Sequence, residues 1–176
     1  RGHRIEVLLC HEARLGDGQD RLEKELNARG IATHRVEATA QVNPRLVAAW
    51  FAHLRQLQPD VVHSHSLKTD VLSAPLCRML SLPLVIEVHG YLRPDYLRVR
   101  MYERLDRLSL RLASAVLTLS GDYRAEVIAS GVSPTRTHLL PSGIDLARLR
   151  SQASLRDLRT ELCKKDEIVI GMVARL

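Results

Sequence analysis

The chain has few aromatic residues, no long hydrophobic run and no cysteine pair. Aromatic residues make up 3% of its 176 residues, so the core must be aliphatic, and stacking platforms for nucleic acid are nearly absent. No run of about 18 apolar residues occurs, which excludes a membrane-spanning helix. Cys10, Cys77 and Cys163 are odd in number and far apart, which favours reduced thiols in a cytoplasmic protein over a disulfide framework.

The phosphate-binding loops of common nucleotide-binding folds are also missing. Neither GxGxxG after a strand nor GxxxxGK[ST] occurs, which argues against dinucleotide-binding and P-loop proteins. Three histidines suggest a metal site, because His63 and His65 share one face of a predicted strand and His89 adds a third imidazole. No HExxH, DxH or cysteine pair completes a zinc shell. We therefore expect no metal and no other cofactor.

Positive charge is what the chain has in excess. The net charge is +6, which suits a phosphate-bearing ligand, an anionic membrane or simply a solvated basic surface. In the helix predicted over residues 95–113, an apolar stripe lies beside a basic stripe. The apolar stripe comprises Leu97, Met101, Leu105, Leu108 and Leu112, and the basic stripe Arg100, Arg104, Arg107 and Arg111. Two interpretations stay open: arginines at the rim of a packed helix, or a surface for anionic lipid or a phosphorylated acceptor.

Short apolar runs alternate with helical patterns along the whole chain. This order predicts an α/β fold with a parallel sheet covered by helices. Asn43 and Pro44 open a confident helix, and Pro75 predicts a kink or a late start in the next one. The predicted strands are 5–9, 31–36, 60–65, 84–88, 115–119, 137–140 and 168–174, and the predicted helices are 20–29, 44–58, 69–80, 95–113 and 122–130, with another around Leu155, Leu158 and Leu162.

The stretch PLVIEVHGY, residues 83–91, places chemistry at the end of an apolar strand. In open α/β sheets, ligands bind outside the carboxyl ends of the strands, which is where His89 and Gly90 fall. Glycine there lets the backbone approach a ligand closely. Glu87 needs a partner or an edge of solvent, because burying an unpaired carboxylate is costly. It is either part of a structural network or a general base.

Four segments, in this order, carry a resemblance to a family. They are DVVHSHSLKTDVLSAPLCRMLSLPLVIEVHG, AVLTLSGDYRAEVIASGV, HLLPSGID and IVIGMVARL. This pattern resembles glycosyltransferase family 4, of the GT-B fold. The resemblance implies a Rossmann-like doubly wound parallel sheet and a second domain across a cleft. It also implies retaining transfer of a sugar from a nucleotide-sugar donor to a polysaccharide or lipid-linked acceptor, without an essential metal.

The resemblance also implies site residues. His89 is expected beside the transferred sugar as the catalytic residue, and Arg175 at the donor's phosphates. Ser142 stands where the family usually has asparagine, which puts a side-chain amide contact in doubt. The expected substrate-binding residues are Gly90, Ser120, Ser142, Gly143 and Asp145.

The family pattern sets the expected domain boundaries as well. Residues 1–145 are expected to form an acceptor-binding domain, 146–166 an interdomain linker and helix, and 167–176 the start of a donor-binding domain. The family's first strand and glycine-rich loop come before the matching region, so we expect an internal fragment that lacks this strand. Because that strand is central in the sheet, its two neighbours should have unpaired edges. Such a fragment should be inactive alone.

Two other functions stay open at this point. One is a nucleotide-sugar epimerase of the same fold. The other is a non-catalytic module that binds anionic lipid or glycan through the stripe Arg100 to Arg111. Nucleic acid is not expected as a partner. We expect a cytoplasmic protein, in contact with the inner face of the membrane if the basic stripe binds lipid.

Overall fold

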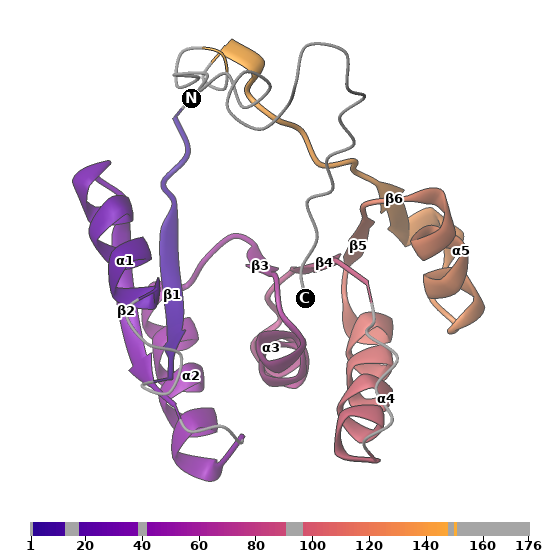
Figure 1. Cartoon of the computed structure of the whole chain (residues 1–176). Coiled ribbons are helices and arrows are strands. Elements are labelled where there is room, and N and C mark those ends of the chain that lie inside the picture. The colour runs from indigo at the N-terminus through magenta and orange to yellow at the C-terminus, as the bar shows by residue number, and fades with distance from the viewer. Residues whose placement is uncertain (1, 13–17, 39–41, 91–96, 148–149, 151–176) are drawn as a thin grey trace, which may run out of the picture. The chain divides into compact units, whose positions relative to one another are not determined.

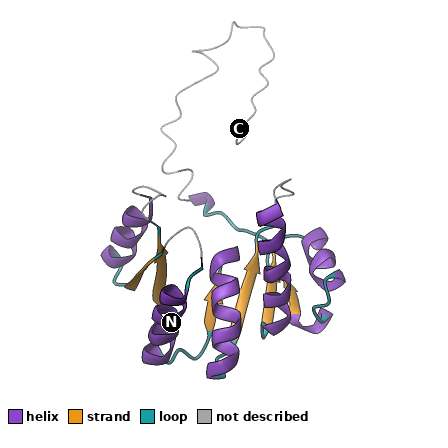
Figure 2. Cartoon of the chain, turned by 90° about the horizontal axis from the view of Figure 1, so that it is seen from below, coloured by secondary structure: helices purple, strands orange, loops and turns teal. Residues whose placement is uncertain are grey.

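The computed structural model describes residues 2–12, 18–38, 42–90, 97–147 and 150. The chain divides into two compact units, Arg1–Pro141 and Ser142–Leu176. Strands and helices alternate through the first unit, as the apolar runs predict (Figures 1 and 2). The predicted helix around Leu155 and the predicted strand 168–174 lie outside the described residues.

All strand pairs that the structure describes are parallel, which confirms the predicted α/β class. β1 (Glu6–His11) pairs with β2 (Ala32–Glu37), and together they form a two-stranded sheet. A second sheet has the order β3-β4-β5-β6. Its strands are β3 (Val62–Ser64), β4 (Leu84–Val88), β5 (Ala115–Thr118) and β6 (Thr137–Leu139).

The break between the two sheets falls where the sequence led us to expect it. Within the described residues, β1 pairs with β2 alone and β3 pairs with β4 alone. One direct link across the break is an ion pair of 2.6 Å between Lys68 Nζ and Glu12 Oε1. Both side chains are largely buried, so this pair ties the end of β1 to the helix that follows β3.

Helices connect the strands and cover the sheets. They are α1 (Gly18–Ala28), α2 (Pro44–Leu57), α3 (Leu67–Leu80), α4 (Leu97–Leu112) and α5 (Gly121–Ala129), with a short 3₁₀ turn at Pro134–Arg136. α3 packs against both α2 and α4. Figures 1 and 2 show α3 and α4 side by side on one face of the four-stranded sheet.

Two of these helices begin as local chemistry dictates. The Asn43 side chain accepts a hydrogen bond of 2.9 Å from the Leu46 amide, which confirms it as the N-cap of α2. α3 begins at Leu67, with Ser66 as its N-cap, and continues through Pro75. The helix thus begins two residues before the predicted Thr69, where Ser66 caps the free amides, and the late start that Pro75 suggested does not occur.

The core is aliphatic, as the scarcity of aromatics required. Leu46, Trp50 and Leu54 of α2 are buried as predicted, and the Trp50 Nε1 donates a hydrogen bond of 3.0 Å to Ser73 Oγ of α3. Ile86 of β4 and Val116 of β5 are fully buried at the centre of the four-stranded sheet.

The apolar stripe of α4 does not lie on the buried face of this helix. Met101, Leu105, Leu108 and Leu112 are 41–56% exposed. The buried face carries Asp106, Ser109 and Leu110 instead. Asp106 faces buried Asp70 of α3, so the interface of these helices includes a pair of carboxyl groups.

Candidate active site at the carboxyl edge of the four-stranded sheet

The carboxyl ends of β3, β4 and β5 bring three predicted segments to one edge. The register pairs Ser64 with Ile86 and Val88 with Thr118. His65 therefore follows β3, His89 follows β4 and Ser120 follows β5 at the same edge of the sheet. Because strands of this kind end together, residues separated by dozens of positions in sequence become neighbours.

Glu87 lies at the centre of a group of three imidazoles. Its Oε2 is 3.2 Å from His65 Nδ1 and 3.5 Å from His63 Nε2, and its Oε1 is 3.6 Å from His89 Nε2. The rings of His63 and His65 are 4.1 Å apart, centre to centre. The sequence-based expectation that Glu87 needs a partner is confirmed, and it has three.

Burial differs sharply between the carboxylate and the rings. The Glu87 side chain is 14% exposed, whereas the His89 side chain is 52% exposed. Burial lowers the pKa of His63, the nearby His65 lowers it further, and Glu87 opposes both effects. The Glu87 carboxylate is therefore a largely buried hydrogen-bond acceptor, and the imidazoles around it face solvent. Imidazoles held in this way are suited to orienting hydroxyl groups or exchanging protons.

Both the backbone conformation at residue 90 and the closeness of a neighbouring side chain favour glycine there. Its φ is +108°, and a Cβ at this position would lie 2.3 Å from Tyr123 Oη. The structure therefore gives glycine a steric reason at this position, and the group in contact is a side chain of α5. A ligand contact at Gly90 stays a prediction.

Ser120 has a clear structural task. Its Oγ accepts a hydrogen bond of 3.3 Å from the Tyr123 amide and caps α5. Ser120 and Gly90 thus meet the same residue, Tyr123, from two neighbouring strands. A substrate contact by Ser120 is a prediction that this capping role neither requires nor opposes.

The other predicted site residues fall into three groups. Ser142, Gly143 and Asp145 are exposed and belong to the second unit. Arg175 lies outside the described residues. The four arginines of the basic stripe lie on α4, where Arg107 pairs with Glu126 of α5 at 2.9 Å and Arg111 donates to the Ser130 carbonyl.

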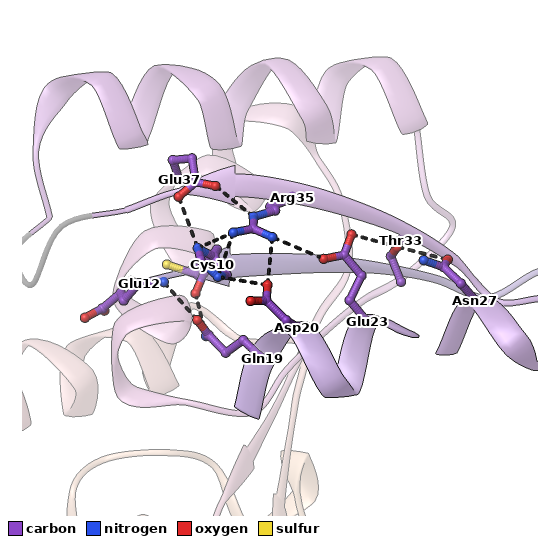
Figure 3. Close-up of polar contacts among 10 residues, drawn as sticks. Cys10, Glu12, Gln19, Asp20, Glu23, Asn27, Thr33, Arg35 and Glu37 are labelled. Atoms are coloured by element: carbon purple, nitrogen blue, oxygen red, sulfur yellow. Dashed lines mark hydrogen bonds and ion pairs between the residues drawn. The ribbon is translucent and has the colours of Figure 1, made fainter. Parts of the chain in front are cut away.

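A second polar cluster, centred on Arg35, was missed by the sequence analysis (Figure 3). Arg35 of β2 contacts Asp20 at 2.8 Å, Glu23 at 3.5 Å and Glu37 at 2.7 Å. Its Nη2 also lies against the ring of buried His11. Hydrogen bonds from His11 and then from Arg35 lower the pKa of the Glu37 carboxyl. Only the alternation of Arg35 and Glu37 along a strand hinted at this cluster, because its other members come from β1 and α1.

Comparison with known proteins adds the following findings. The sequence profile described as glycosyl transferase 4-like domain matches residues 1–143. A curated relative from Escherichia coli, UDP-Gal:alpha-D-GlcNAc-diphosphoundecaprenol alpha-1,3-galactosyltransferase, is 24% identical over 176 residues. The match covers 96% of this chain and 45% of the relative, so the chain spans about half the length of that protein.

Solved structures show the same fold. Anabaena HepE, in complex with UDP and glucose, matches with a TM-score of 0.65 at 18% identity, over 90% of this chain and 50% of HepE. UDP-N-acetylglucosamine 2-epimerase from Rickettsia bellii matches with a TM-score of 0.59 at 15% identity, over 91% of this chain and 51% of the epimerase. The expected GT-B-like architecture of the first unit is therefore confirmed. None of the helices in the described part of the chain is long and apolar enough to span a membrane.

Proposed function

Because the chain belongs to the glycosyl transferase 4-like domain family, we propose that it is the acceptor-side half of a retaining glycosyltransferase. The enzyme moves a sugar from a nucleotide-sugar donor to a lipid-linked or polysaccharide acceptor. Two findings support these substrates: the E. coli relative is named for a UDP-galactose donor and a diphosphoundecaprenol acceptor, and HepE was solved with UDP and glucose.

The observation that carries the proposal is the position of His89. Its ring follows β4 at the carboxyl edge of the sheet, is half exposed, and is 3.6 Å from the largely buried carboxylate of Glu87. In the proposed reaction, His89 lies beside the transferred sugar and orients or shares a proton with its hydroxyls. Glu87 is a positioning residue that holds the ring in place.

The proposed roles of the remaining residues follow from their chemistry. Arg175 binds the donor's diphosphate, because a planar guanidinium carries a permanent charge and two parallel donors. Charge stabilisation at this leaving group supplies most of the rate enhancement. Gly90 and Ser120 of the first unit are proposed to contact substrate, and so, independently, are Ser142, Gly143 and Asp145 of the second unit.

The test compares His89→Ala with wild type in the protein that contains this chain. UDP-galactose and GlcNAc-diphosphoundecaprenol, the substrates named for the E. coli relative, are the first probes. We expect turnover to fall by about 10²–10⁴-fold, the usual contribution of a positioned proton-transfer group. His53→Ala on α2 is the matched control and should keep wild-type turnover. A His89→Ala variant that retains more than about a third of wild-type turnover contradicts the role.

We expect the 176 residues alone not to transfer sugar.

A second proposal concerns α4, which presents apolar and basic side chains together. Met101, Leu105 and Leu108 are exposed, and Arg100 and Arg104 lie exposed on the same helix. An in-plane helix of this composition binds anionic bilayers through its apolar face and its charge. This contact would bring the enzyme to a lipid-linked acceptor.

Vesicle flotation tests this contact. The protein should float with phosphatidylcholine vesicles that contain phosphatidylglycerol and should not float with phosphatidylcholine alone. The double variant Arg100→Glu, Arg104→Glu should lose binding. The double variant Arg45→Glu, Arg55→Glu makes the same change of charge on exposed positions of α2 and should keep it. Equal binding by both double variants would remove α4 as the contact.

A further inference from the structure

The cluster around Glu87 has the composition of a metal centre. Imidazole nitrogens of His63 and His65 and a carboxylate oxygen of Glu87 all lie within 4.8 Å of one another. Glu87 Oε2 lies 3.2 Å from His65 Nδ1 and 3.5 Å from His63 Nε2. Ligands of a tetrahedral ion with bonds of about 2.0–2.1 Å are roughly 3.3 Å apart. The two distances to Glu87 Oε2 therefore already have nearly the spacing that a bound ion imposes.

The backbone fixes this spacing. His63 and His65 are two residues apart at the end of β3, so their side chains share one face of the sheet. The register places Ser64 opposite Ile86, and Glu87 therefore comes level with His65 on the adjacent strand. His63 and Glu87 lie on the paired strands β3 and β4, where ligands are held more precisely than on loops, and His65 directly follows β3. The ligands need only small side-chain adjustments to converge.

Exposure also fits an ion that exchanges with solvent. His63 is 41% exposed and His65 57% exposed, whereas Glu87 is 14% exposed. The histidines provide an entry path, and the carboxylate provides the negative charge in a partly desolvated position. A fourth position on the ion would face outward, and the His89 ring lies on the other oxygen of Glu87 at 3.6 Å. Three protein ligands with one open position is the arrangement of catalytic rather than structural zinc sites.

The donor set selects the metal. Two imidazoles with a single carboxylate suit zinc and its first-row neighbours, whereas magnesium and calcium prefer sites built from oxygen ligands. Contrary to the expectation from the sequence, in which no zinc shell could be completed, we propose that His63, His65 and Glu87 form a three-ligand Zn²⁺ site at the carboxyl edge of the four-stranded sheet. This proposal stands whether or not the protein transfers sugar, because it concerns metal binding alone.

A purely structural explanation makes a different prediction. If Glu87 only accepts hydrogen bonds from three rings, the cluster is complete without an ion and has no selectivity among metals. If it is a zinc site, the protein takes up one ion, prefers Zn²⁺ to Mg²⁺, and loses this ion when a ligand is removed. Metal titration separates the two explanations without any measurement of enzymatic activity.

The experiment is a calorimetric titration of the metal-free protein with Zn²⁺, repeated with Mg²⁺. We expect one equivalent of Zn²⁺ to bind and no measurable binding of Mg²⁺. His65→Ala and Glu87→Gln should each weaken Zn²⁺ binding by at least about tenfold, since even outer-shell changes cost 10–100-fold. Co²⁺ in place of Zn²⁺ should give visible absorption bands that disappear in His65→Ala.

Two controls keep the result specific. His53→Ala removes an imidazole from α2 and should bind Zn²⁺ like wild type. Cys10→Ser removes a half-buried thiol and should also keep the site. Circular dichroism verifies that each variant is folded, and His65→Ala is the safer variant because its ring is the more exposed. Wild-type protein that takes up no Zn²⁺, or full affinity in folded His65→Ala and Glu87→Gln, would overturn the proposal.

Discussion

Gly90 and Tyr123 are in contact across two elements that are 33 positions apart in the sequence (123 − 90 = 33). A Cβ on Gly90 would lie 2.3 Å from Tyr123 Oη and 2.5 Å from its Cζ. Tyr123 is also the residue whose amide binds the Ser120 cap. The end of β4, the end of β5 and the start of α5 are thus joined through one tyrosine, directly beside His89.

The first prediction concerns Gly90→Ala. The glycine has a φ of +108°, which an L-residue rarely adopts, and its added methyl group collides with the tyrosine ring. We expect the free energy of unfolding to fall by about 1–3 kcal/mol, the usual range for a strained backbone position. Urea denaturation followed by circular dichroism measures this change.

A double-mutant cycle divides this effect into its two causes. In the background of Tyr123→Ala, the collision is gone and only the backbone cost of Gly90→Ala should remain. Gly18→Ala in α1 is the matched control, because nothing lies within 4 Å of its added Cβ, and it should be neutral or slightly stabilising. An equal loss in both backgrounds would show that the tyrosine contact is irrelevant.

The second prediction is a pH dependence that comes from Asp70. Burial, opposed by a hydrogen bond to Ser64 and assisted by Asp106, raises the pKa of Asp70 from 3.8 to about 8. Between these values the unfolded chain is ionised at this position while the folded chain holds a proton. The free energy of unfolding should therefore fall as the pH rises from about 4 to about 8, by at most about 1.4 kcal/mol for each pH unit.

Asp70→Asn tests this assignment. The amide keeps the shape and cannot ionise, so the variant should lose much of the pH dependence and gain stability at the upper end of the window. Asp60→Asn changes an exposed carboxyl and should follow the wild-type curve. Urea denaturation at about pH 5 and about pH 8 is sufficient. A wild-type protein that is as stable at the higher pH as at the lower would contradict the raised pKa.

The sequence predicted best where one local signal dominated. The apolar run 84–88 became β4, and Asn43 followed by Pro44 began α2, because strand burial and helix capping are set by neighbouring residues. The position of His89 and Gly90 at a strand end followed from β4 itself. The parallel order of the strands followed from their alternation with helices.

Long-range polar contacts were beyond the reach of sequence reasoning. The convergence of His63, His65 and Glu87 depends on the register of two strands, which no local pattern specifies. The pair of Lys68 and Glu12 joins residues 56 positions apart. The orientation of α4 was equally hard to infer, because the leucine spacing does not mark its buried face, which carries Asp106, Ser109 and Leu110.

The third prediction follows from this orientation of α4. Leu108 is 54% exposed and Leu110 is fully buried, although both belong to the same helix. Leu110→Ala should lower the free energy of unfolding by about 2–5 kcal/mol, as is usual for a buried leucine. Leu108→Ala should change it by no more than about 0.5 kcal/mol. Similar losses in both variants, measured by thermal and urea denaturation, would mean that the leucine stripe is buried after all.

The fourth prediction concerns Arg35, which lies among three carboxylates. Arg35→Ala leaves Asp20, Glu23 and Glu37 close together without their shared cation. We expect a lower Tm at low ionic strength and a smaller loss at high ionic strength, since salt screens repulsion between exposed charges. Arg35→Lys should recover part of the loss, because an ammonium group keeps the charge but not the planar fork.

The matched control for Arg35 is Arg29→Ala, an exposed arginine just after α1. Its Tm should not depend on salt differently from that of the wild type. Differential scanning fluorimetry over a series of salt concentrations gives the comparison. A salt-independent loss in Arg35→Ala would point to packing of its aliphatic stem as the cause.

Strands with two partners and strands with one partner should also differ in how quickly their backbone amide hydrogens exchange for deuterium. β4 and β5 have partners on both sides, so their interior amides open only with the whole domain and should be the last to exchange. β3 is paired along one side only within the described residues, and its amides should be labelled sooner. The strand that carries His63 is then one of two edge strands that open more readily, and the strand that carries Glu87 and leads to His89 is one of the two that are held on both sides.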